Sequence, residues 1–414
     1  MRKDQIKEMI FENLCTKRIV LFGAGILAKE FYNKYKDKLN FAFCVTNDIR
    51  EWGDKKFCGE LDIKQYSKQN IGSEYYVVLC NYFSFGEISI QLDSDDFIVF
   101  EEYVDSKIAE SILDNKKLLF FYGSCILRDI YYYMKNIPAF MDKYTSVFLQ
   151  VKPEETMFDV RRLYNGRKVC DVYVYARKLI DLSKPYNMQR EDLPADCKMI
   201  GVSNVTFNGY WPQIVQDIEH HSEEWIFRLN ERFDSHFWHL MYCRKDANIT
   251  ELVKKGKWPE EIYEIVSAED FYEEKDIKKY LRICFKTLKM AERGLDVKIG
   301  DFIINNYKEE LLYQDFTHPK KKIAWEYVKQ ILACLDVKEP KLKEIEQESP
   351  EYMHQASDIP VYPSVARILG MDWIKDETKY EVLTYRGVEF MTFRDYVIHY
   401  AQYIKQTLEI RRGW

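Results

Sequence analysis

Two distant stretches of the chain carry side chains that could catalyse acyl transfer. Cys125 follows a pair of small residues, Gly123 and Ser124, and a thiolate at such a turn can attack a carbonyl carbon. His318 follows Asp315 at the spacing Asp-x-x-His, in which a carboxylate can orient an imidazole that acts as a general base. The sequence thus supplies a nucleophile, a base and an orienting acid, and whether they meet depends on the fold.

The stretch around Cys125 predicts a buried strand, a tight turn and a helix. Residues 118–122 are five consecutive apolar or aromatic residues, and the glycine and serine that follow permit a turn into a helix over residues 128–134. At the mouth of a helix, unpaired backbone N–H groups and the positive end of the helix dipole favour a thiolate and can hold an oxyanion. The alternative is a structural cysteine, because free cysteine is among the most buried residue types.

Two further loops belong to the candidate site. Pro319 suits the first turn of a helix that apolar periodicity predicts over residues 323–335, so His318 is expected just before a helix start. An aromatic loop, residues 207–212, follows a strand expected at residues 198–204. This loop either clamps a sugar or nucleotide ring or plugs the edge of the domain, and the sequence favours neither alternative.

The beginning of the chain predicts a small Rossmann-like unit. A buried strand at residues 17–22 leads directly into the turn Gly-x-Gly-x-x-Ala, in which Gly23 and Gly25 allow a tight turn and a close approach of the backbone to a phosphate. Asp48 lies at the end of the next expected strand, where a ribose-binding acid is found in such units. Ligand binding here stays open, because a fold does not settle a function.

Length and pattern predict an α/β protein with more than one domain. A chain of 414 residues exceeds one average core. We expect a Rossmann-like parallel-sheet domain at residues 1–104, a larger α/β catalytic domain with a long helical insertion at residues 116–340, and an extension at residues 350–414 that packs on the catalytic domain.

Composition excludes several classes of protein. The net charge of −6 argues against a nucleic-acid binder, which normally carries a basic surplus. No apolar run approaches the ~20 residues that span a bilayer, and no signal peptide begins the chain, so we expect a soluble, cytoplasmic protein. The ten cysteines contain no Cys-x-x-Cys pair, which predicts free thiols. His236 and His239 lie three residues apart on an expected helix, but no Glu-x-x-His or His-Glu-x-x-His pattern accompanies them, so we expect no metal site.

Three landmarks in one order resemble the WcbI family of polysaccharide biosynthesis enzymes. They are the turn that contains Cys125, the stretch from Asn204 through the aromatic loop, and His318-Pro319 before a helix. The family carries a Gly-Asn-Cys-Gln turn, from which this chain departs at Ser124 and Ile126. The resemblance covers about residues 116–340. It implies binding of coenzyme A or acetyl-CoA and acetylation of a sugar in a capsule or related surface polymer.

The same landmarks are similar to the sequence blocks of SGNH-type esterases. In that comparison the turn at Cys125 supplies the nucleophile, the block Gly201 to Asn204 supplies an oxyanion donor, and the block Asp315 to His318 supplies the base. The resemblance thus implies catalytic roles for Cys125, Asn204, Asp315 and His318.

Two sets of residues are candidates for ligand binding. Coenzyme A carries phosphates that cations and helix N-termini bind, and the candidates in the second domain are Gly123, Ser124, Arg128, Arg177 and Lys178. The first domain resembles the nucleotide-sugar-binding modules of enzymes of bacterial surface-sugar biosynthesis. That resemblance implies that Gly23, Gly25 and Asp48 face a nucleotide-sugar rather than NAD.

Three functions remain in competition. The first is an acyltransferase that acetylates a small-molecule or lipid-linked sugar, either through an acyl group on Cys125 or by direct attack of a hydroxyl that His318 deprotonates. The second is an esterase or deacetylase that uses the same residues with water as acceptor. The third is a non-catalytic binding component of a polysaccharide assembly system. The sequence leaves homo-oligomer formation open.

Overall fold

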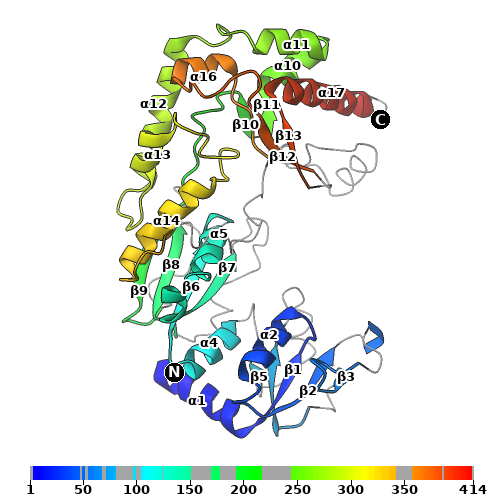
Figure 1. The fold of residues 1–414 in the computed structure, drawn as a ribbon, viewed down its shortest axis with the longest axis vertical. Coiled ribbons are helices and arrows are strands. Elements are labelled where there is room, and N and C mark those ends of the chain that lie inside the picture. Colours follow the sequence, from blue (N-terminus) through cyan, green and yellow to red (C-terminus); the bar gives the residue numbers. More distant parts are fainter. Residues whose placement is uncertain are drawn as a thin grey trace. The chain divides into compact units, whose positions relative to one another are not determined.

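The chain divides into two compact units, which are described separately below (Figure 1). The first unit consists of Met1–Ala176 and Ile180–Ile200, and the second of Arg177–Leu179 and Gly201–Trp414. The structure is a computed structural model, and it describes residues 3–46, 49–51, 55–67, 71–80, 97–98, 104–123, 125–150, 169–177, 193–216, 244–341, 357–384 and 387–412. The domain boundaries expected from the sequence stay predictions.

The first unit begins with a parallel sheet of five strands in the order β3-β2-β1-β4-β5. The central strand is apolar on both faces, since Ile19, Val20 and Leu21 are all fully buried, as expected when helices cover both faces. The α/β class predicted from the sequence is confirmed. The elements are α1 (Lys3–Thr16), β1 (Arg18–Phe22), α2 (Ile26–Tyr35), β2 (Phe41–Thr46), η1 (Ile49–Glu51), β3 (Ile63–Gln65), β4 (Tyr75–Leu79) and β5 (Phe97–Ile98).

A second sheet follows, with four strands in the order β7-β6-β8-β9. Its strand β6 is parallel to both of its neighbours, and residues Leu118 to Phe121 within it are fully buried. The strand and helix expected on either side of the Gly-Ser turn are therefore present. The elements are α4 (Val104–Leu113), β6 (Lys117–Gly123), α5 (Cys125–Met134), α6 (Pro138–Met141), β7 (Tyr144–Gln150), β8 (Val172–Arg177) and β9 (Lys198–Ser203).

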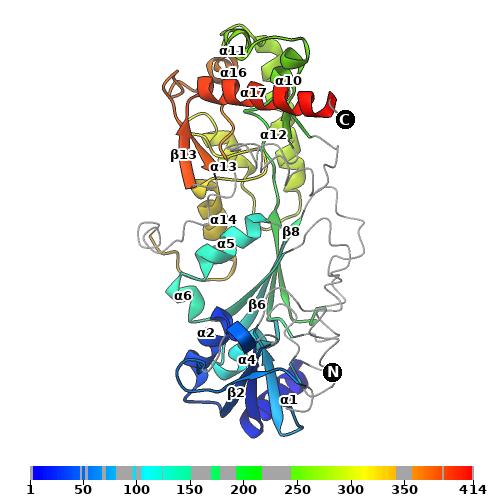
Figure 2. The ribbon, with the colours of Figure 1, turned by 90° about the vertical axis from the view of Figure 1, so that its right-hand side faces the viewer.

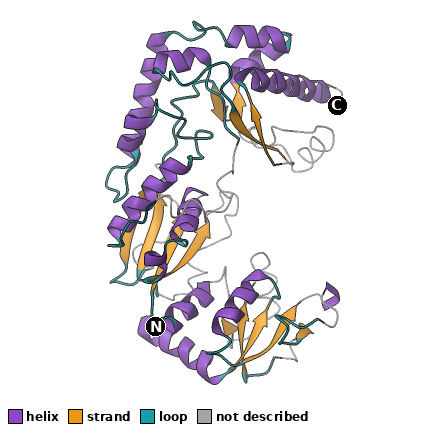
Figure 3. Ribbon diagram, in the orientation of Figure 1, coloured by secondary structure: helices purple, strands orange, loops and turns teal. Residues whose placement is uncertain are grey.

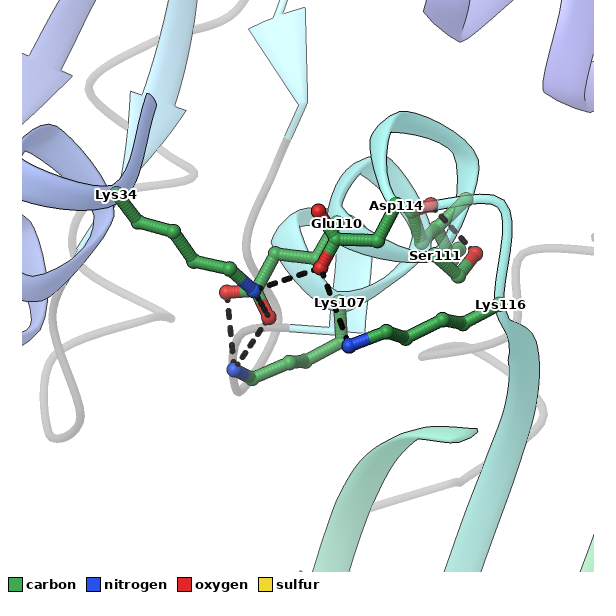
Figure 4. A network of polar contacts seen from close by, with 7 residues as sticks. Lys34, Lys107, Glu110, Ser111, Asp114 and Lys116 are labelled. Carbon is green, nitrogen blue, oxygen red and sulfur yellow. Dashed lines mark hydrogen bonds and ion pairs between the residues drawn. The ribbon is translucent and has the colours of Figure 1, made fainter. Parts of the chain in front are cut away.

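A polar network joins α2, the helix that follows β1, to α4, the helix that precedes β6 (Figure 4). Lys34 of α2 pairs with Asp114 at 2.9 Å and with Glu110 at 3.6 Å. Lys107 also pairs with Glu110, at 2.9 Å, and Lys116 pairs with Asp114, at 3.7 Å. Because both carboxylates are largely shielded from water, these ion pairs are screened less than surface pairs and help to hold α4 against α2.

Helices predominate over strands among the described elements of the second unit (Figure 3). Among the described residues of this unit, β10 pairs with β11 and β12 with β13, both antiparallel. The last helix, α17, packs against α10 and α11 (Figure 2). The elements are β10 (Ile214–Gln216), β11 (Arg244–Asp246), α10 (Ala247–Lys254), α11 (Pro259–Val266), α12 (Glu274–Ala291), α13 (Gly300–Asn306), α14 (Lys321–Cys334), α16 (Pro363–Leu369), β12 (Tyr380–Thr384), β13 (Gly387–Met391) and α17 (Phe393–Arg412).

The segment around Ile359 is hydrogen-bonded to loops of the second unit that come much earlier in the sequence. The indole N–H of Trp211 donates to the carbonyl of Ile359 at 2.8 Å, and the amide of Ile359 donates to the carbonyl of Gln314 at 2.7 Å. Asp358 and Glu381 add a further backbone bond of 2.7 Å. The segment around Ile359 therefore supports the backbone beside the Asp-x-x-His motif. Within the described part of the chain, no helix is long and apolar enough to cross a membrane.

Candidate active site

A buried carboxylate holds the histidine of the Asp-x-x-His motif. Nδ1 of His318 lies 2.7 Å from Oδ2 of Asp315. The side chain of Asp315 is 1% exposed, whereas that of His318 is 22% exposed. An ionised carboxylate accepts a hydrogen bond, so this contact places the ring proton on Nδ1 and leaves Nε2 with the lone pair of a general base. Catalytic triads hold their base by a contact of this kind, and the role of His318 as a base stays a prediction.

The local sequence produces this pair through a short turn. The other carboxylate oxygen of Asp315, Oδ1, accepts from the backbone N–H groups of Thr317 and His318 at 2.7 Å and 2.9 Å, and from the Thr317 hydroxyl at 2.9 Å. Aspartate commonly binds the backbone two residues ahead of it in this way. One oxygen thus fixes the loop while the other faces the imidazole. A role for Thr317 was not predicted from the sequence, although Thr317 lies inside the motif, where its hydroxyl reaches Asp315.

The loop that carries the pair is closed at its base. The amide of Gln314 donates to the carbonyl of His318 at 2.8 Å, and Tyr313 pairs with Pro319 in an isolated bridge. Helix α14 begins only after this loop, at Lys321, and Lys320 is its N-cap residue. The expectation that Pro319 occupies the first turn of the helix is wrong, because this proline belongs to the base of the loop.

Asn204 lies in a loop that is bonded to the histidine loop. It directly follows β9 and is half-buried. The tyrosine hydroxyls of Tyr327 and Tyr313 donate to the carbonyls on either side of it, those of Ser203 at 2.5 Å and Val205 at 3.3 Å. In addition, the amide of Phe207 donates to the carbonyl of Phe316 at 2.9 Å. The structure thus joins the backbone around Asn204 to the backbone of the Asp-x-x-His motif.

A buried glutamate beneath this loop was not identified from the sequence. Oε1 of Glu292 accepts from the Ser203 hydroxyl at 3.2 Å, from the amide of Gly300 at 2.6 Å and from the amide of Ile299. It thereby satisfies free N–H groups at the start of α13 and positions the end of β9. A Cβ atom at Gly300 would lie 2.6 Å from the other glutamate oxygen, so a larger residue there would displace the Glu292 carboxylate.

The aromatic loop plugs the interior and does not offer a free ring face. Phe207, Tyr210 and Trp211 are all fully buried. A Cβ atom at Gly209 would lie 2.4 Å from the ring of Phe207 and 2.9 Å from Leu281. The loop is therefore so tightly packed that a side chain at position 209 would clash. Of the two alternatives, a clamp for a sugar or nucleotide ring and a plug at the edge of the domain, the plug is correct.

Cys125 is the first residue of α5, and β6 ends two residues earlier at Gly123. A Cβ atom at Gly123 would lie 2.8 Å from that of Ala176 and 2.9 Å from Leu127, so glycine is needed where β6, β8 and α5 meet. Ser124 and the side chain of Cys125 lie outside what the structure describes. Cys125 belongs to the first unit and the histidine to the second, and their joint action stays a prediction.

The candidate phosphate-binding cations are only partly described. Arg128 lies on α5, with a 28% exposed side chain whose Nε is 3.8 Å from Oδ1 of Asp129. Arg177 is the last residue of β8, and Lys178 lies outside the described residues. Their role in binding phosphate stays a prediction.

The glycine-rich turn of the first unit lies between β1 and α2, as expected. Gly23 has a φ of +100°, which favours glycine, and Gly25 is the N-cap residue of α2. A Cβ atom at Gly25 would meet no atom within 4 Å, so protein packing alone does not require glycine there. Asp48 lies outside the described residues, as do His236 and His239. Among the residues that the structure does describe, no group of three or more potential ligands could hold a metal ion.

These features define an α/β protein with a histidine–aspartate pair of the kind used for general-base chemistry. Residues 170–340 match the model of the family described as polysaccharide biosynthesis enzyme WcbI. The matched region contains Asn204, Asp315 and His318 and begins after Cys125. This region of the chain is therefore similar to the WcbI family.

A solved structure shows the same fold. It is that of WcbI, described as a novel polysaccharide biosynthesis enzyme and as the native protein without a disulfide bond between CoA and a cysteine. The TM-score is 0.53 at 18% sequence identity, and the similarity covers 70% of this chain and 90% of that one. No curated protein is similar enough to this chain to count as a match.

Proposed function

We propose that the chain is an enzyme of capsule or other surface polysaccharide biosynthesis that transfers an acetyl group from acetyl-CoA to a sugar hydroxyl. The observation that carries the proposal is the buried Asp315 carboxylate bound to Nδ1 of a partly exposed His318. The similarity of residues 170–340 to polysaccharide biosynthesis enzymes supports the pathway. The description of the WcbI structure, which refers to CoA, supports the donor.

The proposed reaction begins with proton removal by His318. Nε2 takes the proton of the sugar hydroxyl, and the oxygen attacks the carbonyl carbon of the thioester. The side-chain amide of Asn204 donates to the oxyanion that forms, while Asp315 stabilises the imidazolium. Collapse of the tetrahedral intermediate breaks the carbon–sulfur bond, and the imidazolium returns its proton to the departing CoA thiolate.

A second route passes through Cys125. Its position at the start of α5 favours a thiolate, which would accept the acetyl group from CoA before the sugar attacks the new thioester. The two routes give the same products and differ only in the acyl-enzyme. An acetyl group on Cys125 in quenched wild-type protein supports the covalent route, whereas full activity of Cys125→Ser leaves the direct route.

Ligand contacts are proposed for two sets of residues. Around the start of α5, the CoA phosphates would meet backbone N–H groups and cations, with Gly123, Ser124, Arg128, Arg177 and Lys178 as candidates. Near the beginning of the chain, the nucleotide-sugar candidates are Gly23, Gly25 and Asp48. The acceptor would be a small-molecule or lipid-linked sugar.

A thermal-shift titration of the full chain tests the donor. A ligand that binds only the folded state stabilises it by about 2.7 kcal/mol at a hundredfold excess over Kd, so CoA and acetyl-CoA should both raise Tm. Nucleotide-sugars are titrated separately, and AMP serves as the control for weak binding of an adenine nucleotide. Absence of any shift with CoA contradicts the proposal. Turnover of an aryl acetate would then favour the esterase alternative, and absence of turnover would favour the non-catalytic one.

A further inference from the structure

Two buried cysteines of the first unit lie with their sulfur atoms in contact. The Sγ atoms of Cys170 and Cys197 are 3.3 Å apart, and both residues are free thiols. Cys170 is fully buried and Cys197 is 5% exposed. Neither residue has a part in the proposed acyl transfer.

The backbone holds the two cysteines at the same end of two neighbouring strands of the second sheet. Cys170 lies just before β8 and Cys197 just before β9, which are neighbouring strands. The amide of Lys198 donates to the carbonyl of Asp171 at 3.0 Å, so the residues that follow the two cysteines are directly paired. Neighbouring strands are about 4.8 Å apart, within the range of about 4.4–6.8 Å that Cα atoms span across a disulfide. A disulfide here therefore requires no separation of the strands.

We propose that Cys170 and Cys197 are a redox modification site, at which a peroxide converts the two thiols into a reversible disulfide that joins the starts of β8 and β9. One sulfur, as a thiolate, attacks a peroxide oxygen to give a sulfenic acid and releases one water after protonation. The second thiol attacks the sulfenic sulfur, the S–S bond forms, and a second water leaves. Overall the two sulfurs lose two electrons to hydrogen peroxide, two thiols become one disulfide, and two waters form.

Two other buried cysteines that the structure describes in this unit, Cys44 and Cys80, make different contacts. The thiol of Cys44 lies 3.2 Å from the carbonyl of Gly23, and that of Cys80 lies 3.7 Å from the carbonyl of Val78. Selectivity for Cys170 and Cys197 follows from the contact between their sulfurs.

Peptide mapping of the full-length protein tests the proposal. Trypsin should release residues 169–177 and 191–198 as separate peptides with one cysteine each. After treatment with hydrogen peroxide and alkylation in denaturant, we expect these two peptides joined, about two hydrogen masses lighter than their sum, and separated again by dithiothreitol. The oxidised protein should also melt at a higher temperature, because the bond closes a loop between residues 27 positions apart.

The controls separate this site from general oxidation. Cys197→Ser should give no joined peptide, and the exposed Cys15 reports that the peroxide dose is sufficient. Separate alkylation of Cys170 and Cys197 at a dose that fully oxidises Cys15 would overturn the proposal, and so would either peptide joined to a different cysteine. The wild-type map alone decides the question if the serine variant does not fold.

Discussion

Asp315→Asn should lower kcat for acetyl transfer by about 10³–10⁴ while KM for acetyl-CoA changes little. Oδ1 of the asparagine would keep the bonds from the amides of Thr317 and His318, so the new NH₂ group would face Nδ1 of the imidazole. An NH₂ group donates, which moves the ring proton to Nε2 and removes the lone pair of the base. The measurement is steady-state release of CoA thiol.

The matched control is Asp376→Asn, which neutralises an exposed carboxylate of the same unit and should leave kcat unchanged. Circular dichroism and Tm show whether the Asp315 variant is folded, because its side chain also closes a turn. A folded Asp315→Asn protein with kcat within a factor of about two of the wild type would show that Asp315 does not set the tautomer of His318.

The second large effect concerns Asp246, the N-cap residue of α10. Its side chain is fully enclosed, accepts from the amide of Ile249 at 3.0 Å and from the hydroxyl of Tyr362 at 3.0 Å, and lies near the rings of Tyr396 and Tyr400. Burial raises the pKa of Asp246 to about 7, and the hydrogen bonds only partly oppose this shift. The folded protein therefore holds this proton more tightly than the unfolded chain does.

The sign of the pH dependence follows from that difference. Below about pH 4 the carboxyl is protonated in both states, whereas between about pH 4 and 7 the unfolded chain loses the proton first, so the free energy of unfolding falls as pH rises. A difference of about three pKa units corresponds to about 4 kcal/mol. Asp246→Asn, which keeps an N-cap acceptor, should remove this slope.

Urea unfolding of wild type and Asp246→Asn at several pH values between about 4.5 and 8 measures the effect. The difference between the two free energies of unfolding isolates Asp246 from the other titrating groups. We expect the asparagine variant to gain relative to wild type with rising pH. A difference that stays constant over this range would mean that Asp246 ionises in the folded protein as easily as in the unfolded chain.

Local sequence patterns predicted the two elements that carry the candidate catalytic residues. The strand and the helix on either side of the Gly-Ser pair are signalled by residues close to Cys125 in the sequence. The contact of Asp315 with His318 is likewise made within one short motif. Such signals are complete within about ten residues, so they can be read without the fold.

Long-range contacts could not be predicted in the same way. The bond from Trp211 to Ile359 joins residues 148 positions apart, and the bond from Tyr327 to Ser203 joins residues 124 positions apart. The aromatic loop stayed ambiguous because burial of its rings depends on this packing. Glu292 was overlooked for the same reason, since its partners at Ser203 and Gly300 come from separate elements.

The most direct test of the central claim compares acetyl transfer to a sugar by wild type, His318→Ala and His399→Ala. Each protein is incubated with acetyl-CoA labelled in the acetyl group and a panel of sugar acceptors, and the acetylated sugar is detected by mass spectrometry. General-base catalysis contributes about 10²–10⁴-fold, so we expect labelled sugar from wild type and His399→Ala and a loss of that size in His318→Ala. Equal transfer by all three proteins, or no labelled sugar from wild type with any acceptor that binds, would contradict the account.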